Sequence, residues 1–186
     1  MLIGISPRPP TTGGVPPPVW ATVAPDQAAT SEPFLASVRP ARIGDMRAIE
    51  PLIRTFAAQN IMLPKSFDQL ARTFREFVVA EDEAGEILGC GALRVYTEGL
   101  AEVCSLAVEA NCQGLGIGRM LVERLVEEAR ALDLTTVFAL TLKADFFLRL
   151  GFRIVSKEDF PLKVWADCRN CPKLHACDEI AVALDI

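Results

Sequence analysis

Two kinds of hydrophobic periodicity alternate along residues 36–186 of this 186-residue chain. In some segments apolar residues recur every three or four positions, as in an amphipathic helix, and in others they form short runs, as in a buried strand. The spacing predicts helices after Asp45, a suitable N-cap, after Pro64, and over residues 116–132. Strands are predicted over residues 37–42, 77–80, 87–93, 100–108, 137–140 and 180–184. This order predicts a mixed α/β (α+β) domain with one central sheet.

Capping and breaking residues refine several of these elements. Either Ser66 or Asp68 can cap the second helix. A short helix is expected over residues 145–150, because Gly151 suits the left-handed position that ends many helices. Pro40 cannot donate a ladder hydrogen bond, so the first strand is expected at an edge of the sheet.

Residues 1–35 differ from the rest of the chain in composition. Nine of the thirteen prolines lie within residues 1–40, and residues 7–18 read PRPPTTGGVPPP. Such a segment has little apolar surface to offset the entropy cost of ordering. We therefore expect a disordered, Pro-rich tail followed by a single folded domain over 36–186. An inert extension and a recognition role for Pro16–Pro18 are the two interpretations of the tail.

Charge and cysteine content exclude several functions. The formal net charge is -5 and the sequence pI about 5.0, which argues against a nucleic-acid binder, since that class needs a basic face. No apolar run is long enough for a transmembrane helix, and the first residues do not resemble a secretory signal. We expect a cytoplasmic protein without membrane association. In that compartment the six cysteines are expected to be free thiols or metal ligands rather than disulfides.

A glycine-rich loop, residues 113–118 with the sequence QGLGIG, leads from the strand predicted over 100–108 into the long helix. Backbone amides at a helix N-terminus form an anion site, and a pyrophosphate is a natural occupant. The loop is not a Walker A motif, because Arg119 and Met120 follow Gly118, and it fits the Rossmann spacing poorly. A tight turn without a ligand is the alternative.

The Gln-x-x-Gly-x-Gly pattern after a strand resembles the acetyl-CoA signature of the GNAT N-acetyltransferases. The segments SLAVEAN (105–111) and FLRLGF (147–152) resemble other parts of that family in the same order. The resemblance covers about residues 37–186 and implies a GNAT-like fold, a central mixed, mostly antiparallel sheet flanked by helices. It implies that the following residues hold acetyl-CoA: Leu106, Ala107, Val108, Gln113, Gly114, Leu115, Gly116, Ile117, Gly118 and Phe147.

The resemblance also suggests the chemistry. Acetyl transfer requires a deprotonated amine, and Glu102 resembles the strand glutamate that serves many members as the base. Many members carry a tyrosine where this chain has Phe147, so either the CoA thiolate leaves unprotonated or another donor serves. The only tyrosine, Tyr96, lies elsewhere in the sequence. An acyl-carrying role for Cys104 is disfavoured, because the family transfers directly and no histidine partner is visible.

Further segments resemble the acetyltransferase domain of bacterial N-acetylglutamate synthase. They include MLPKS (62–66), REFVVA (75–80), LGCGAL (88–93) and the C-terminal block LKVWADCRNCPK (162–173). This implies transfer to the α-amine of an amino acid, L-glutamate above all, by direct attack in a ternary complex in the first step of arginine biosynthesis. Lys65 and Arg75 are the candidate cations for the carboxylates of the substrate. Relatives often have arginine at the position of Cys104, a departure that bears on the choice of amino acid.

Three cysteines and the only histidine lie close together near the C-terminus. The candidate ligands of a tetrahedral zinc ion are Cys168, Cys171, His175 and Cys177. A second Cys-x2-Cys pair is missing, so a redox-sensitive pair and a hairpin packed around thiols remain as alternatives. Cys90, Cys104 and Cys112 are scattered and are interpreted as structural.

Two alternative functions remain open from the sequence. One is a GNAT enzyme that acts on another small amine or on a protein N-terminus. The other is a non-catalytic acyl-CoA-binding or metal-responsive module. The resemblance also suggests a homodimer.

Overall fold

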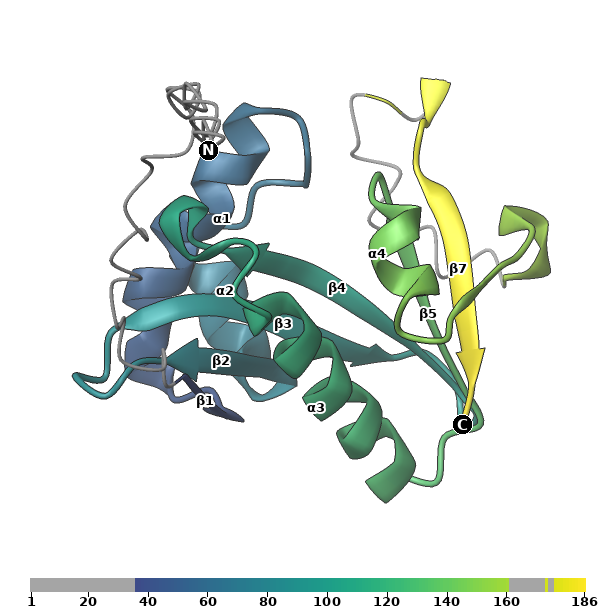
Figure 1. Ribbon diagram of the computed structural model, residues 1–186, viewed down its shortest axis with the longest axis horizontal. Coiled ribbons are helices and arrows are strands. Elements are labelled where there is room, and N and C mark those ends of the chain that lie inside the picture. Colours follow the sequence, from purple (N-terminus) through teal and green to yellow (C-terminus); the bar gives the residue numbers. More distant parts are fainter. Residues whose placement is uncertain (1–35, 161–172, 174–175) are drawn as a thin grey trace, which may run out of the picture. The chain divides into compact units, whose positions relative to one another are not determined.

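The computed structural model describes residues 36–160, 173 and 176–186. Over these residues the chain forms a seven-stranded sheet in the order β1-β2-β3-β4-β5-β7-β6 (Figure 1). The strands are β1 (Ser37–Pro40), β2 (Phe77–Glu81), β3 (Ile87–Val95), β4 (Leu100–Val108), β5 (Thr136–Thr141), β6 (Arg153–Ile154) and β7 (Ile180–Asp185). Neighbouring strands are antiparallel except for β4 and β5. The mixed, mostly antiparallel sheet predicted above is therefore confirmed.

Helices cover both faces of the sheet. They are α1 (Met46–Ala58), α2 (Phe67–Thr73), α3 (Ile117–Ala131) and α4 (Ala144–Leu148). Short 3-10 turns are η2 (Ile43–Asp45), η3 (Phe74–Glu76), η4 (Ala110–Cys112) and η5 (Lys157–Asp159). One apolar core contains residues of α1 and α2 together with β2 and β3, and a second contains residues of α3 and α4 together with the opposite face of the sheet. Every helix in the described residues is too short or too polar to cross a membrane.

Side-chain hydrogen bonds cap the start of α2 and anchor the residue that precedes α1. Ser66 caps α2, because its hydroxyl accepts from Gln69 N while the Gln69 side chain accepts from Ser66 N. Ser66, rather than Asp68, is thus the cap of the second helix. Asp45 directly precedes α1, but its carboxylate does not cap that helix. It accepts instead from the Arg39 guanidinium at 2.7 Å, which ties β1 to the beginning of α1.

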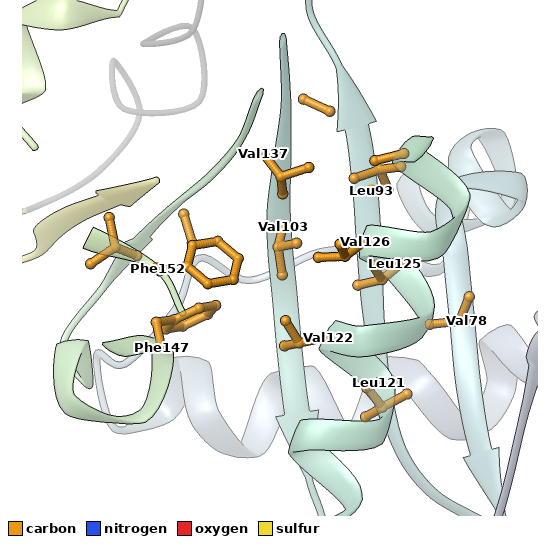
Figure 2. Packing of buried hydrophobic residues seen from close by; sticks show 14 of the residues in the cluster. Val78, Leu93, Val103, Leu121, Val122, Leu125, Val126, Val137, Phe147 and Phe152 are labelled. Carbon is orange, nitrogen blue, oxygen red and sulfur yellow. The ribbon is translucent and has the colours of Figure 1, made fainter. Parts of the chain in front are cut away.

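The core on the α3 side joins elements that lie far apart in the sequence. Figure 2 shows Leu121 and Leu125 of α3 lying over the sheet, with Val103 of β4 beside them. Phe147 of α4 and Phe152 pack edge to face at 5.2 Å between ring centroids, and both belong to this core. The helices α3 and α4 therefore share one core on the same face of the sheet.

The strands at and near the two edges of the sheet can be compared with the strands that the sequence predicted. β1, which ends at Pro40, is the edge strand, as predicted. At the other side, β7 lies between β5 and β6, so the last residues of the chain complete the sheet. The strand predicted over 180–184 is confirmed, and a further short strand, β6, follows Phe152.

Candidate active site

A bulge interrupts β4 in the segment that resembles the acetyl-CoA signature. One residue of β3, Gly91, lies opposite two residues of β4, Ser105 and Leu106. Ser105 has a left-handed backbone conformation with φ 52°. The extra residue reverses the alternation of side chains, so that Val103 before the bulge and Leu106 after it both face the α3 core.

β4 and β5 separate close to this bulge. The ladder between them ends at the pair Glu102–Phe138, although β4 continues to Val108 and β5 to Thr141. Figure 1 shows the two strands diverging from a common end. In the described part of the chain, the backbone of Leu106–Val108 has no pairing partner from β5. Backbone groups without a strand partner can bind an extended ligand by the hydrogen bonds that a strand would otherwise make.

The glycine-rich loop connects this separated strand to α3. Gly116 occupies the N-cap position of α3 with φ 87°, and a Cβ built there would meet nothing within 4 Å. No side chain caps the helix. The Gln113 amide donates to Val108 O at 3.1 Å and ties the loop to the end of β4. The first-turn amides and the positive end of the helix dipole therefore face an open position that suits an anion.

Gly89, which the sequence analysis did not single out, keeps β3 close to the same section of β4. A Cβ at this position would lie 2.8 Å from Ala107 O and 3.3 Å from the Leu121 side chain. A contact of 2.8 Å with a backbone atom cannot be relieved by a side-chain rotation. A glycine inside a strand often marks such a close approach of another backbone, so the position of Gly89 within a predicted strand could have indicated its role.

Phe147, the position at which the family resemblance led us to expect a tyrosine, lies in the core and is 4% exposed. Its ring packs edge to face against Phe146 at 5.1 Å, and Phe146 in turn lies 3.4 Å from a Cβ built on Gly118. The two phenylalanines thus join α4 to the first turn of α3. A phenylalanine ring has no acidic hydrogen, so Phe147 cannot protonate the leaving thiolate.

A cluster of charged and polar side chains lies on the face of the sheet opposite α3. Glu102 projects from β4 at the point where β4 and β5 separate, and its partner across the β3 ladder is Arg94. Arg94 Nε lies 3.5 Å from a carboxylate oxygen of Glu76 in η3. The Tyr96 hydroxyl donates to Glu102 Oε2 at 2.8 Å. The tyrosine that seemed remote in the sequence therefore contacts the predicted base.

Lys65 and Arg75, the two predicted substrate cations, lie in different surroundings. Lys65 is partly buried in the loop before α2, and its positive charge only partly opposes the burial that raises the pKa of Cys104. Cys104 lies on β4, two residues after Glu102. Arg75 is exposed, and its guanidinium lies over the Phe74 ring at 5.6 Å. Arg94, which the sequence analysis missed, is a cation that the structure brings beside Glu102.

Two thiols near the site are held in the protonated form. Burial, reinforced by the charge of Glu102, raises the pKa of Cys104 to about 12. Burial likewise raises the pKa of Cys90 to about 12, and its sulfur lies 3.6 Å from Ser105 O beside the bulge. A protonated thiol is a poor nucleophile, so both cysteines fit the structural role assigned to them.

Three of the four candidate zinc ligands, Cys168, Cys171 and His175, lie outside the described residues. The fourth, Cys177, is exposed, and the Lys157 ammonium lies 3.3 Å from its sulfur. Among the described residues no group of three His, Cys, Asp or Glu side chains is placed to hold a metal ion. The zinc site remains a prediction from the sequence.

A strand followed by a glycine loop at a helix N-terminus is the arrangement that the acetyl-CoA motifs predicted, and the structure adds the bulge in β4 and its separation from β5. Comparison with known proteins agrees with it: residues 45–152 match the acetyltransferase (GNAT) family. The chain belongs to this family, and the protein is an acetyltransferase.

Particular relatives confirm the resemblance to the amino-acid acetyltransferases. An uncharacterised N-acetyltransferase of Chlorobaculum tepidum is 44% identical over 145 residues, which are 78% of this chain and 93% of that protein. The amino-acid acetyltransferase of Mycobacterium tuberculosis is 40% identical over 136 residues, which are 72% of this chain and 78% of that protein.

A solved structure extends the comparison to three dimensions. The N-acetylglutamate synthase of Neisseria gonorrhoeae, complexed with coenzyme A and N-acetyl-glutamate, superposes with a TM-score of 0.73 at 28% identity. The match covers 81% of this chain but 35% of that one, so this chain corresponds to about a third of the gonococcal enzyme.

Proposed function

We propose that this protein transfers the acetyl group of acetyl-CoA to the α-amine of an amino acid, with L-glutamate as the acceptor, in the first step of arginine biosynthesis. The observation that carries the proposal is the position of Glu102, a carboxylate at the point where β4 and β5 separate. The names of the mycobacterial and gonococcal relatives support an amino acid as the acceptor.

The cosubstrate is expected to lie along β4 and the glycine loop. Its pyrophosphate is anionic and suits the first-turn amides of α3 at Gln113–Gly118. Its pantetheine arm is extended and can hydrogen-bond to the backbone of Leu106–Val108, which lacks a partner from β5. The gonococcal structure, to which this chain is similar, is complexed with coenzyme A, which supports acetyl-CoA as the cosubstrate.

The chemistry is a direct transfer. The amine nitrogen attacks the thioester carbonyl carbon, a C–N bond forms, and the C–S bond breaks. Glu102 accepts the proton that the amine loses, directly or through a water molecule. The sulfur leaves as the CoA thiolate, since Phe147 in the position of the usual tyrosine has no proton to donate.

The acceptor requires cations for its carboxylates. Lys65 is the better candidate of the two predicted cations, because it is partly buried whereas Arg75 is exposed. Arg94 adds a second positive charge on β3, although Glu76 lies 3.5 Å from it. Cys104 stands where relatives often carry an arginine. Glutamate has two carboxylates, so this chain offers one cation fewer for the second carboxylate than those relatives do.

The test is to incubate the purified protein with acetyl-CoA and each of the twenty amino acids in turn, and to identify acetylated products by mass spectrometry. N-acetylglutamate as the dominant product supports the proposal, provided that Glu102→Gln strongly reduces it. Another acetylated amino acid would retain the reaction and reject glutamate as the acceptor. No acetylated amino acid, despite measurable CoA binding, would reject the proposal in favour of a protein or polyamine acceptor or a non-catalytic module.

A further inference from the structure

We propose that Tyr96 is a positioning residue that orients the Glu102 carboxylate and holds it ionised; this inference rests on the function proposed above. The Tyr96 hydroxyl donates to Glu102 Oε2 at 2.8 Å. The hydroxyl hydrogen can serve only one strong acceptor at this distance, so the bond restricts the orientation of the carboxylate. The proton lost by the amine goes to Glu102, and the phenol keeps its own.

The position of the tyrosine is set by the main chain and by its ring. Tyr96 directly follows β3, and its backbone amide donates to Leu100 O at 2.9 Å across the turn into β4. Its ring lies 6.0 Å from the ring of Phe138, and Phe160 stacks on the other side of that core aromatic at 4.2 Å. The hydroxyl is thus presented by a packed aromatic cluster, which lowers the entropy cost of the hydrogen bond.

Several charged groups act on this pair from neighbouring elements. The positive charge of Arg94 on β3 partly opposes the rise in the pKa of Tyr96, and Glu76 of η3 lies 3.5 Å from Arg94. Burial and the charge of Glu102 raise the pKa of Cys104, and the charge of Lys65 partly opposes that rise. The positive charges favour an ionised Glu102, Glu76 opposes ionisation, and Cys104 is neutral. The hydroxyl of Tyr96 adds a hydrogen bond that only the ionised carboxylate accepts fully.

The hydrogen bond from Tyr96 to Glu102 also influences how activity depends on pH. Burial, followed by the charge of Glu102, raises the pKa of Tyr96 well above its usual range, so the phenol remains a donor at every pH at which the enzyme is tested. A donor to the carboxylate favours the ionised form and lowers the pKa of Glu102. Removal of the hydroxyl therefore raises the pKa of Glu102, and activity at low pH is lost earlier.

The experiment compares the wild-type protein with Tyr96→Phe, which keeps the ring and removes only the hydroxyl. The acidic limb of the kcat/KM profile is expected to move up by about one pH unit, with kcat reduced about 10-fold at neutral pH. Phe160→Leu is the matched control, because it disturbs the same aromatic cluster and leaves the hydroxyl in place. It is expected to lower thermal stability and to move the limb by much less than Tyr96→Phe does.

Three results would overturn the inference: an acidic limb that Tyr96→Phe leaves unmoved, a limb that Phe160→Leu moves equally, or a further shift by Tyr96→Phe when Glu102 is already glutamine. If the wild type acetylates no amino acid, the proposed function fails. The inference is then tested by titrating the Glu102 carboxyl carbon by NMR in both proteins. An unchanged pKa in Tyr96→Phe rejects it, and a higher one supports it.

Discussion

The separated strands β4 and β5 and the charged cluster beside them offer a ligand different kinds of groups. Along Leu106–Val108 and the loop around Gly116, the available groups are backbone amides and carbonyls. Around Glu102 they are the side chains of Arg94 on β3, Glu76 in η3 and Tyr96 directly after β3. The first region is shaped by φ angles and a bulge, and the second by which side chains the sheet register brings together.

This difference predicts how each region responds to mutation. A backbone site tolerates changes of side chain but not of backbone conformation, so its sensitive positions are glycines. A side-chain site depends on single functional groups and tolerates changes that preserve the strand. Four experiments test this contrast, in order of decreasing effect.

Glu102→Gln is expected to have the largest effect. It removes the base and retains the size of the side chain, and loss of a general base typically costs about 100- to 10,000-fold in rate. We expect kcat to fall by about 1,000-fold, or about 4 kcal/mol of transition-state stabilisation, with the KM for acetyl-CoA unchanged. Steady-state kinetics with product detection by mass spectrometry measures both. An activity close to wild type would remove Glu102 from the mechanism.

Gly116→Val is expected to act through the backbone. Its φ of 87° is strained for valine, and the side chain would project where the anion is expected. We expect kcat/KM for acetyl-CoA to fall about 100-fold, or about 2.7 kcal/mol. Gly85→Val is the matched control, because Gly85 has φ 82° and equally open surroundings but lies in the turn between β2 and β3. Equal losses in both variants would attribute the effect to general strain.

Gly89→Ala tests the close approach of β3 and β4. Its Cβ would lie 2.8 Å from Ala107 O, so the two strands must move apart. We expect the free energy of unfolding to fall by about 2 kcal/mol, as for overpacking elsewhere, together with weaker CoA binding. Denaturant unfolding and calorimetry measure the two quantities. Gly44→Ala serves as the control, since a Cβ there meets nothing within 4 Å, and a similar loss in that variant would contradict the argument.

Lys65→Met and Arg75→Met separate the two predicted cations. Lys65→Met removes a partly buried positive charge proposed to bind a substrate carboxylate, and we expect the KM for the amino acid to rise about 10-fold, or about 1.4 kcal/mol. Arg75 is exposed and stacked on Phe74, so its replacement is expected to leave this KM within about twofold. The reverse order of effects would assign the carboxylate contact to Arg75.

The two regions also differ in how well they could be predicted. The Gln113–Gly118 loop and the bulged strand lie within one continuous stretch, so their local pattern predicted the strand, the turn and α3. The partnership of Tyr96 and Glu102 could not be found in this way, because it depends on the register of β3 against β4. Gly89 was missed for the same reason, since the carbonyl that excludes a side chain there belongs to Ala107.

The order of helices and strands, the edge position of Pro40, the cap at Ser66 and the acetyl-CoA motifs all follow from residues close together in the chain. Periodicity, capping and turn formation act over a few residues and are therefore visible in the sequence. The insertion of β7 between β5 and β6, the burial of Phe147 and the cluster around Glu102 depend on contacts between distant segments. Those contacts arise only when the sheet forms, because its register decides which distant side chains become neighbours.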